Sequence, residues 1–233
     1  KKFRKPIWRK FTQALNEYDL IQDGDKIAVC ISGGKDSMLM AKLFQELERH
    51  GKKNFEVVFL VMNPGYNEVN YQTILNNAKM LNIPITVFRT EIFDTVVDIT
   101  DSPCYLCARM RRGYLYSKAR ELGCNKIALG HHYDDAIETL LMNLLFEGRI
   151  NCFQPVTNLD RTGIVQIRPM LYIHEKTLDN FAARMNLPVL QNRCPVDKVT
   201  KRGEVKQLIF ELSKTYPELK ERIFGAMQRY PLA

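Results

Sequence analysis

The sequence predicts an α/β fold built on a parallel β-sheet with helices on both faces. Short apolar, β-branched runs alternate with longer stretches of helical periodicity, which is the pattern of repeated βαβ units. The first such run leads directly into a glycine pair and a helix start within Ser32–Ser37. After Pro188 no strand-like run follows and charged helical segments take over. We therefore expect a five-stranded sheet with helical N- and C-terminal extensions.

Five strands are predicted in chain order from runs rich in β-branched and apolar residues. They are Lys26–Ile31, Glu56–Met62, Ile85–Arg89, Lys126–Gly130 and Val165–Arg168. Helices are predicted from periodicity and from start and stop signals. They are Pro6–Tyr18, Ser37–His50, Glu68–Leu81, Tyr105–Leu122, Asp134–Leu145, Glu175–Met185, Glu204–Thr215 and Pro217–Gln228. Gly148–Thr162 is predicted to be a polar connection without a strand.

Length and charge indicate one principal domain and a polyanionic partner. A chain of 233 residues with 45% hydrophobic content can bury one substantial core. We expect a catalytic domain over 23–187, a basic helical arm over 1–22 and a helical appendage over 188–233. Lys plus Arg exceeds Asp plus Glu by 34 − 26 = 8, and a positive excess favours nucleic acid as a partner. The basic arm is equally compatible with phosphate contacts and with a mobile tail.

Hydropathy and cysteine usage bear on the compartment. No apolar run reaches the roughly 18 residues that a membrane helix needs, so we expect a soluble, cytoplasmic protein without membrane contact. The six cysteines do not follow the pattern of a small disulfide scaffold. They point to a reducing compartment and to metal or redox chemistry.

The segment Ser32-Gly-Gly-Lys-Asp-Ser37 has the features of a phosphate-binding loop. A strand, a glycine pair and a helix start direct backbone N–H groups and the positive end of a helix dipole at one anion. The glycines permit close approach of the backbone, Lys35 offers a cation and the serines offer hydroxyls. The spacing is not that of a Walker A loop. An ordinary helix-capping turn is the alternative, and the order of all six residues disfavours it.

Two further strand ends are expected beside this loop, because the carboxyl ends of parallel strands meet at one edge of a sheet. The second strand ends at Met62, and the fourth runs into Gly130-His-His-Tyr-Asp-Asp135. Asp134 and Asp135 are candidates to hold Mg²⁺ or to orient a reacting carbonyl, and His131 is expected near the phosphates. Aspartates also start helices whatever the function, so Asp135 is the candidate for catalysis and Asp134 the candidate for capping.

Three cysteines are candidate metal ligands. Cys104 and Cys107 lie three residues apart at a predicted helix start, on one face of its first turn, where the helix dipole favours thiolate. A CxxC pair alone is compatible with a redox couple, half a zinc site or coincidence. Cys194 adds a third candidate, and no second close pair completes a Cys₄ zinc site. Three thiolates suit a [4Fe-4S] cluster with one iron left free.

Taken together, these motifs closely resemble the tRNA 2-thiocytidine synthetases of the PP-loop ATP-pyrophosphatase superfamily. The resemblance runs from about Trp8 to Tyr230. It covers SGGKDS, the CxxC with the following Arg109-Met-Arg-Arg-Gly113, GHHYDD, Ile167-Arg-Pro-Met-Leu171 and the late cysteine. It implies a Rossmann-like fold of the adenine nucleotide alpha-hydrolase type and an ATP- and Mg²⁺-dependent tRNA sulfurtransferase. It also implies a homodimer.

The resemblance implies a role for each matching residue. ATP would contact Ser32, Gly33, Gly34, Lys35, Asp36, Ser37, Met62, Gly130 and His131. Asp135, Arg111 and Lys35 would be catalytic, and Cys104, Cys107 and Cys194 would hold the cluster. Arg111 and its neighbours Arg109 and Arg112 are also compatible with a solvated basic face that contacts tRNA phosphates.

This chain departs from the family pattern at its late cysteine. The thiocytidine synthetases carry a CxxC there, whereas Arg193 precedes a single Cys194 in this chain. The related 2-thiouridine synthetases carry additional zinc-binding cysteine sets, which this chain lacks. The differences favour cytidine and leave the modified base open.

The implied reaction has two steps, and other readings of the motifs remain. The C2 carbonyl oxygen of a pyrimidine attacks the α-phosphate of ATP and releases pyrophosphate, and sulfur then displaces AMP. Sulfur comes from sulfide or from a cysteine desulfurase persulfide, through the cluster or through a persulfide on this chain. The alternatives are a lysidine synthetase-type ligase, a small-molecule synthetase of the same fold and a non-catalytic nucleotide-binding module.

Overall fold

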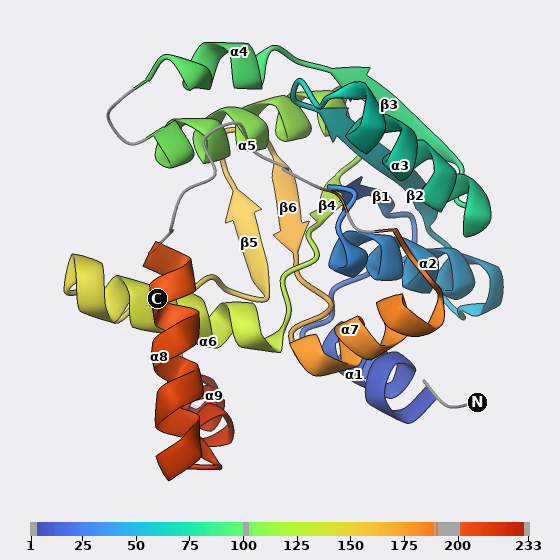
Figure 1. The fold of residues 1–233 in the computed structure, drawn as a ribbon. Helices are drawn as coiled ribbons and strands as arrows, with labels where there is room; N and C mark the ends of the chain where they lie inside the picture. Colours follow the sequence, from blue (N-terminus) through green and yellow to red (C-terminus); the bar gives the residue numbers. More distant parts are fainter. Residues whose placement is uncertain (1–3, 100–102, 189, 191–200, 231–233) are drawn as a thin grey trace.

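A computed structural model describes residues 4–99, 103–188, 190 and 201–230. In this part of the chain six strands form one sheet in the order β3-β2-β1-β4-β6-β5 (Figure 1). The strands are β1 (Lys26–Ile31), β2 (Glu56–Asn63), β3 (Ile85–Arg89), β4 (Lys126–Ala128), β5 (Val156–Leu159) and β6 (Ile164–Ile167). The pairings among β1, β2, β3, β4 and β6 are parallel, whereas β5 runs antiparallel to β6.

The helices connect and flank these strands. They are α1 (Arg9–Glu17), α2 (Lys35–His50), α3 (Glu68–Met80), α4 (Ile92–Val97), α5 (Pro103–Glu121), α6 (Tyr133–Met142), α7 (Glu175–Arg184), α8 (Lys201–Thr215) and α9 (Leu219–Arg229). Two five-residue π-helical turns, η1 (Arg4–Trp8) and η2 (Asn143–Glu147), precede α1 and extend α6. None of the described helices is long and apolar enough to cross a membrane.

The sixth strand corrects the prediction of a five-stranded, all-parallel sheet. β5 lies inside Gly148–Thr162, the segment predicted to be a polar connection, and pairs with β6 from Val156↔Ile167 to Leu159↔Ile164. None of its side chains is fully buried, because it is the last strand at the edge of the sheet. A half-exposed edge strand lacks the continuous apolar run by which the parallel strands were found. The six-residue helix α4 was also not predicted, since it is too short for a clear period.

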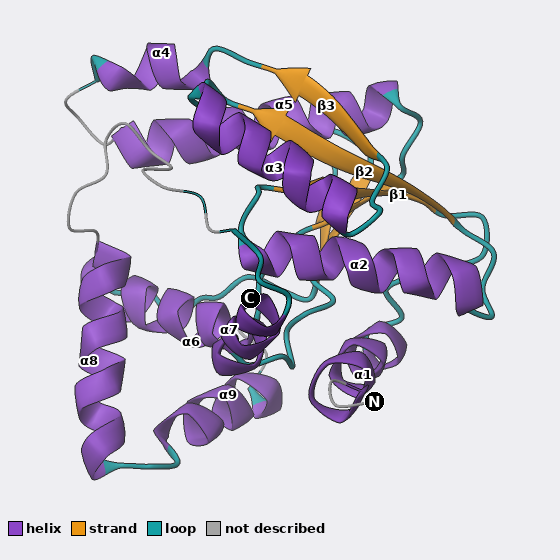
Figure 2. Cartoon of the chain, turned by 45° about the vertical axis from the view of Figure 1, so that its right-hand side comes forward, coloured by secondary structure: helices purple, strands orange, loops and turns teal. Residues whose placement is uncertain are grey.

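The core lies on both faces of the sheet because side chains alternate along each strand. Ile27, Val29 and Ile31 of β1 face one side, where α1, α2, α3 and α7 cover them. Ala28 and Cys30 face the other side, which α5 covers. The ribbon shows the same three layers (Figure 2). The N-terminal helix α1 is therefore part of the main core, through Phe11 and its neighbours.

A separate apolar cluster holds the C-terminal helices against α6. Ile137 of α6, Ile209 of α8 and Phe224 of α9 are all buried in it. Tyr133 stacks against Phe224 with ring centroids 4.4 Å apart. Residues 201–230 are thus anchored on the helix that starts with the GHHYDD motif.

Candidate functional site

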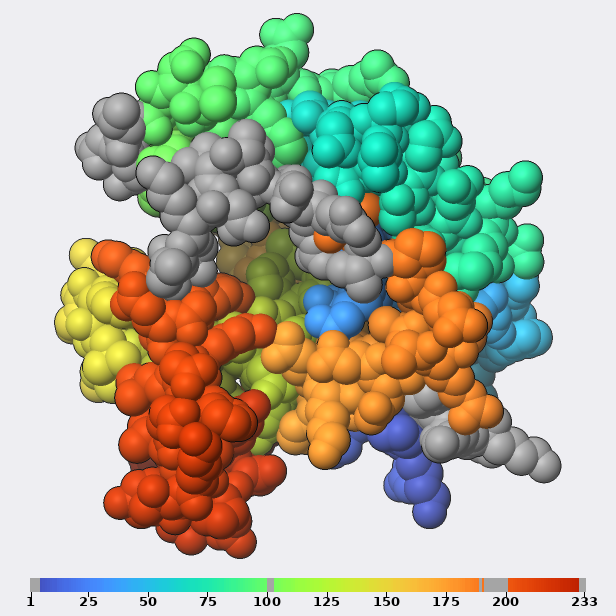
Figure 3. Space-filling view, viewed as in Figure 1, coloured from blue at the N-terminus to red at the C-terminus, as the bar shows by residue number. Residues whose placement is uncertain are grey.

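A pocket of ≈ 340 Å³ opens where the connections from two neighbouring strands diverge. The chain leaves β1 for β2 on one side, while β4 lies on the other side of β1, so the loops after β1 and β4 part at this point. This reversal of strand order is where open α/β sheets bind ligands. The surface is hollowed between α5 above and α7 and α8 below, with the start of α2 visible inside (Figure 3).

The pocket wall combines residues from four segments of the chain. Its lining residues are Cys30, Ile31, Ser32, Asp36, Ser37, Met62, Tyr66, Arg111, Leu115, Leu129, Gly130 and His131. Ser32, Asp36, Ser37, Met62, Gly130, His131 and Arg111 were predicted to belong to the site. The other lining residues, Cys30, Ile31, Tyr66, Leu115 and Leu129, were not predicted as site residues. Tyr66 lies only a few residues after the end of β2. The carboxyl ends of parallel strands form the ligand-binding edge of the sheet, so a tyrosine just after β2 could have been identified from the sequence as a site residue.

Gly33 and Ser37 fix the shape of the SGGKDS loop. Gly33 has φ +83°, and a Cβ there would lie 2.6 Å from Ile74 Cγ1 and 2.7 Å from Leu190 Cδ1. Ser37 Oγ donates to Gly34 O at 2.9 Å and accepts from Ser32 N at 3.1 Å. The serine thus closes the turn from inside, and only glycine fits at position 33.

The loop after β4 closes the opposite side of the pocket. A Cβ on Gly130 would lie 3.5 Å from Ser37 N, so the two motif backbones approach each other closely. His131 follows, with its ring centroid 4.9 Å from that of Phe153. Burial lowers the pKa of His131 to about 4, and the nearby Arg168 guanidinium acts in the same direction. A neutral imidazole therefore lines the pocket, and its buried Nδ1 has no hydrogen-bond partner among the described residues.

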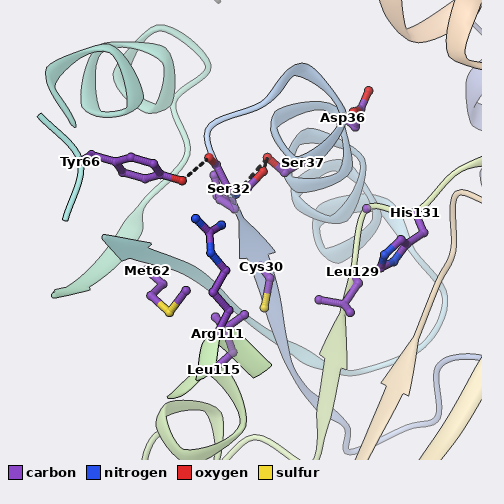
Figure 4. A pocket seen from close by; sticks show the side chains of 12 residues that line it. Cys30, Ser32, Asp36, Ser37, Met62, Tyr66, Arg111, Leu115, Leu129 and His131 are labelled. Atoms are coloured by element: carbon purple, nitrogen blue, oxygen red, sulfur yellow. Dashed lines mark hydrogen bonds between the residues drawn. The ribbon is translucent and has the colours of Figure 1, made fainter. Parts of the chain in front are cut away.

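Arg111 supplies a cation to the pocket. Its side chain rises from α5 toward Ser32, between Met62 and Cys30 (Figure 4). Its Cζ lies 5.4 Å from the centre of the Phe93 ring, and its buried Nε has no hydrogen-bond partner in the described structure. A guanidinium held by an aromatic ring with an open donor is suited to contact a phosphate oxygen.

Lys35 lies outside the pocket wall. Its Nζ is 3.3 Å from Asp36 Oδ1, 3.4 Å from Asp179 Oδ1 and 3.8 Å from Glu175 Oε1. The last two carboxylates belong to α7, so the side chain points from the loop toward that helix. The cation that lines the pocket in this structure is Arg111 and not Lys35.

The aspartate pair at the start of α6 is fully engaged with the protein. Asp135 Oδ2 accepts from His132 N at 3.0 Å, and Asp135 Oδ1 accepts from Arg202 Nη1 at 2.8 Å. Asp134 Oδ2 accepts from Glu175 N at 2.7 Å, and its Oδ1 pairs with Lys220 Nζ at 2.5 Å. His132 is the N-cap of α6 and forms a capping box with Asp135. Neither aspartate lines the pocket.

A run of ion pairs joins α6 and α7 to α8. Arg202 lies 3.6 Å from Glu138 Oε2, and Lys206 lies 3.6 Å from Glu138 Oε1 and 2.8 Å from Glu175. Glu138 is only 2% exposed. Burial raises its pKa to about 7, although Lys206 acts in the opposite direction. These contacts lead from the GHHYDD helix to Glu175, which also pairs with Lys35.

The two cysteines of the CxxC lie on the first turns of α5 as free thiols. Cys104 is exposed, and Cys107 is half-buried against the cluster that contains Met62 and Phe93. Arg111, which enters the pocket, follows Cys107 by one helical turn. Cys194 lies outside the described residues. Within the described residues no set of three His, Cys, Asp or Glu side chains is placed to hold a metal ion.

The sequence matches a family model described as the PP-loop domain over residues 4–212. It is 36% identical to the tRNA-cytidine(32) 2-sulfurtransferase of Shewanella baltica (strain OS185), across 97% of this chain and 74% of that protein. It is 34% identical to the protein of the same name from Pelobacter propionicus, across 95% of this chain and 86% of that protein.

A solved structure has the same overall arrangement. The U34-tRNA thiolase NcsA from Methanococcus maripaludis, solved with its [4Fe-4S] cluster, superposes with a TM-score of 0.78 and 25% identity. The match covers 95% of this chain and 77% of that structure.

Proposed function

The chain belongs to the PP-loop domain family, and we propose that it is an enzyme that uses ATP to replace an oxygen of a tRNA base with sulfur. The base is cytidine, and the product is 2-thiocytidine. The curated relatives named above support cytidine, since both are named for cytidine 32. NcsA is named for uridine 34, so 2-thiouridine made by the same chemistry is the alternative.

One observation carries this proposal: the helix of the CxxC cysteines reaches into the pocket of the SGGKDS loop. Arg111 of α5 lines the same pocket as Ser32, Ser37, Gly130 and His131. A nucleotide held by the loop would therefore lie beside the helix that carries the thiols. This neighbourhood suits a reaction in which ATP activates a carbon and sulfur attacks it.

ATP fits the polar and apolar halves of the pocket. The start of α2 directs its first N–H groups and dipole toward the loop, which favours a pyrophosphate. Ser32, Ser37 and Asp36 stand on this side of the pocket. Met62, near the end of β2, and Tyr66, just after it, offer an apolar wall for adenine. For Lys35 and Asp135 to be catalytic, as this proposal has them, Lys35 must break its ion pairs with α7 and Asp135 must break its ion pair with Arg202 of α8.

The thiols of Cys104 and Cys107 fit two ligand positions of a [4Fe-4S] cluster. They are unpaired, lie one turn apart and stand at the exposed start of a helix. We propose Cys194 as the third ligand. The bound cluster would leave one iron free of protein ligands and so supply a binding position for sulfide. Mg²⁺ is proposed beside the pyrophosphate, with Asp36 as its neighbouring carboxylate.

The activation step uses groups of this chain to bind and orient. The C2 oxygen of the base forms a bond to the α-phosphorus of ATP, and the bond to the β-phosphate oxygen breaks to release pyrophosphate. Arg111 stabilises the negative charge on the α-phosphate oxygens as this happens. Neutral His131 accepts or donates a hydrogen bond without adding charge to the departing pyrophosphate.

The second step replaces oxygen with sulfur. Hydrosulfide forms a bond to C2, the bond from C2 to the adenylate oxygen breaks, AMP leaves, and the sulfur proton passes to solvent. The donor of the sulfur is free sulfide, or the persulfide of a cysteine desulfurase from which a thiol reductant releases hydrosulfide while being oxidised to a disulfide. A homodimer in the cytoplasm is part of the same proposal.

The test of the cluster is anaerobic purification followed by iron and acid-labile sulfide analysis. The parent chain is expected to carry about four irons and four sulfides. Cys194→Ala is expected to lose them or to hold them unstably, and Cys124→Ala, which changes a buried cysteine in the sheet core, serves as the matched control. An iron-free parent under strictly anaerobic conditions would sink the cluster mechanism.

Thiolation itself is tested by mass spectrometry of nucleosides from tRNA incubated with the chain, ATP and sulfide. The proposal requires 2-thiocytidine together with one pyrophosphate per base modified. If lysine is incorporated into the tRNA instead, and Cys104→Ala is fully active, the chain is a lysidine synthetase-type ligase.

A further inference from the structure

The outward face of α5 carries a stripe of one tyrosine and two arginines. Tyr105, Arg109 and Arg112 are spaced by four and three residues, so they fall on one side of the helix. All three are exposed, Tyr105 to 66%. With Gly113, they span an arc of about 100° at 3.6 residues per turn. We call these four residues the α5 stripe.

The α5 stripe carries positive charge without acidic residues beside it on the same helix to balance it. Between Pro103 and Arg120 the helix has no acidic residue, and its first one is Glu121. Arg109 and Arg112 form no ion pair with a described residue. Unpaired guanidinium groups beside an exposed aromatic ring are the combination that contacts the phosphates and stacks the bases of single-stranded RNA.

Gly113 is an independent sign that a ligand backbone approaches this face. It lies in the middle of α5 and is exposed, and a Cβ added there would meet nothing within 4 Å. Glycine weakens a helix interior, and in this position no internal packing requires it. A missing side chain beside the two arginine positions leaves room for a ribose or phosphate to reach the helix backbone.

The α5 stripe and the candidate site lie on opposite sides of α5 and meet at its exposed start. Cys104, Cys107 and Arg111 fall in an arc of about 60°, whose centre lies roughly 160° around the helix from the centre of the stripe. Tyr105 follows Cys104 directly at the exposed start of the helix. A base stacked on Tyr105 would thus precede or follow a nucleotide that turns around the helix start toward Cys104.

We propose that the α5 stripe is the surface on which the single-stranded loop of the tRNA lies, with a base stacked on Tyr105 and phosphates on Arg109 and Arg112. This inference rests on the proposed function. Its ligand is an unpaired RNA loop, because aromatic stacking needs a base that is not already stacked in a duplex. The arginines hold the backbone without reading its sequence.

The test is the dissociation constant of an unmodified tRNA transcript, measured against salt concentration. Tyr105→Ala is expected to weaken binding roughly tenfold through loss of stacking. Arg109→Ala and Arg112→Ala are each expected to lower the slope of log K against log salt by about 0.7. Gly113→Ala is expected to raise the midpoint of thermal unfolding and still weaken tRNA binding. A purely structural role predicts no change in tRNA binding for Gly113→Ala.

Matched variants on other surfaces separate this effect from a general loss of charge or aromatic area. Tyr216 is 56% exposed at the junction of α8 and α9, and Arg49 is exposed in the last turn of α2. Tyr216→Ala and Arg49→Ala are expected to bind tRNA like the parent. ATP affinity is expected to stay unchanged in every variant.

Two results would overturn the inference in distinguishable ways. If the parent binds and thiolates tRNA while the Tyr105 and Gly113 variants bind it equally well, the surface is wrong and the proposed function stands. This includes the case in which these variants change only the oligomeric state, which would make the stripe a protein contact. If the parent has no affinity for tRNA, both proposals fail.

Discussion

At the residue scale, the phosphate loop is fixed by one glycine that has no substitute. Gly33 combines a positive φ with Ile74 and Leu190 packed where a Cβ would be. The chain offers several glycines with the same backbone but open space, among them Gly24 and Gly148. Conformation and packing can therefore be separated by experiment.

Gly33→Ala is expected to lower the free energy of unfolding by more than the roughly 1–2 kcal/mol that a left-handed conformation costs an alanine, because Ile74 must also move. Gly24→Ala, with φ +84° and nothing within 4 Å, carries the conformational cost alone. Urea denaturation of both variants measures the difference. Equal losses would show that the contacts of Gly33 do not constrain the loop.

Glu138 predicts a dependence of stability on pH. The pKa of this buried carboxyl is raised to about 7, so the folded chain holds the proton more tightly than the unfolded chain. The associated stability is fully present below about pH 4.5 and is lost as pH rises through about 7, to a limit of about 3 kcal/mol.

Glu138→Gln is expected to remove this pH dependence. Between pH 5 and about 8 the parent's unfolding free energy should therefore fall relative to that of the variant. Glu204→Gln, on the exposed side of α8, is expected to keep the parent slope. Chemical denaturation across the pH range makes the comparison. A parallel pair of curves for parent and Glu138→Gln would contradict the assignment.

At the scale of elements, the start of α6 is the junction of the molecule. Through its two carboxylates, Asp134 binds the backbone start of α7 and Lys220 of α9, while Asp135 binds Arg202 of α8. The helix that begins in the GHHYDD motif thus organises the three helices that follow it. The acidic pair is the means of attachment.

Asp134→Asn is expected to cost about 2 kcal/mol or more in unfolding free energy, because it weakens charged hydrogen bonds to a 5%-exposed group. Glu218→Gln is the control: it breaks the exposed pair with Arg222 on the first turn of α9 and is expected to cost under about 0.5 kcal/mol. Losses of equal size in the two variants would argue against the junction.

The sequence predicted the elements with strong periodicity and missed those shaped by their neighbours. The parallel strands and the helices around them follow from continuous apolar runs, and they lie close to their predicted bounds. β5 was missed because an edge strand needs little apolar sequence. Lys35 was predicted to contact the phosphates because it belongs to the phosphate-binding loop. In the structure its side chain instead points to Glu175 and Asp179, which lie 140 or more positions later in the chain. No local pattern records such a contact.

At the scale of the whole molecule, the site depends on segments drawn from most of the chain. The pocket collects residues from Cys30 to His131, and α8 holds the start of α6 from beyond Lys201. Within the described residues, α5 carries both the CxxC thiols and the arginine that lines the pocket. The two half-reactions of the proposed function should therefore be separable.

Cys104→Ala is expected to keep tRNA-dependent release of pyrophosphate while it loses 2-thiocytidine formation, because Arg111 and the loop remain in place. Arg111→Met is expected to slow pyrophosphate release itself by removing the pocket cation. A pyrophosphate assay and nucleoside mass spectrometry on the same samples distinguish the two steps. Loss of both products in Cys104→Ala would show that the thiol helix also serves activation.

The strand order also has a consequence for synthesis on the ribosome. β1 lies inside the sheet and pairs with β2 along one side and with β4 along the other. Its β2 partners come about thirty residues later in the chain, and its β4 partners come about a hundred residues later, as in the pair Ile27↔Lys126. While the nascent chain grows, β1 can pair with β2 long before β4 has been translated. One edge of the most apolar strand stays unpaired during that interval, where it can recruit another nascent chain. Translation rate through residues 64–125 should therefore influence the yield of folded protein.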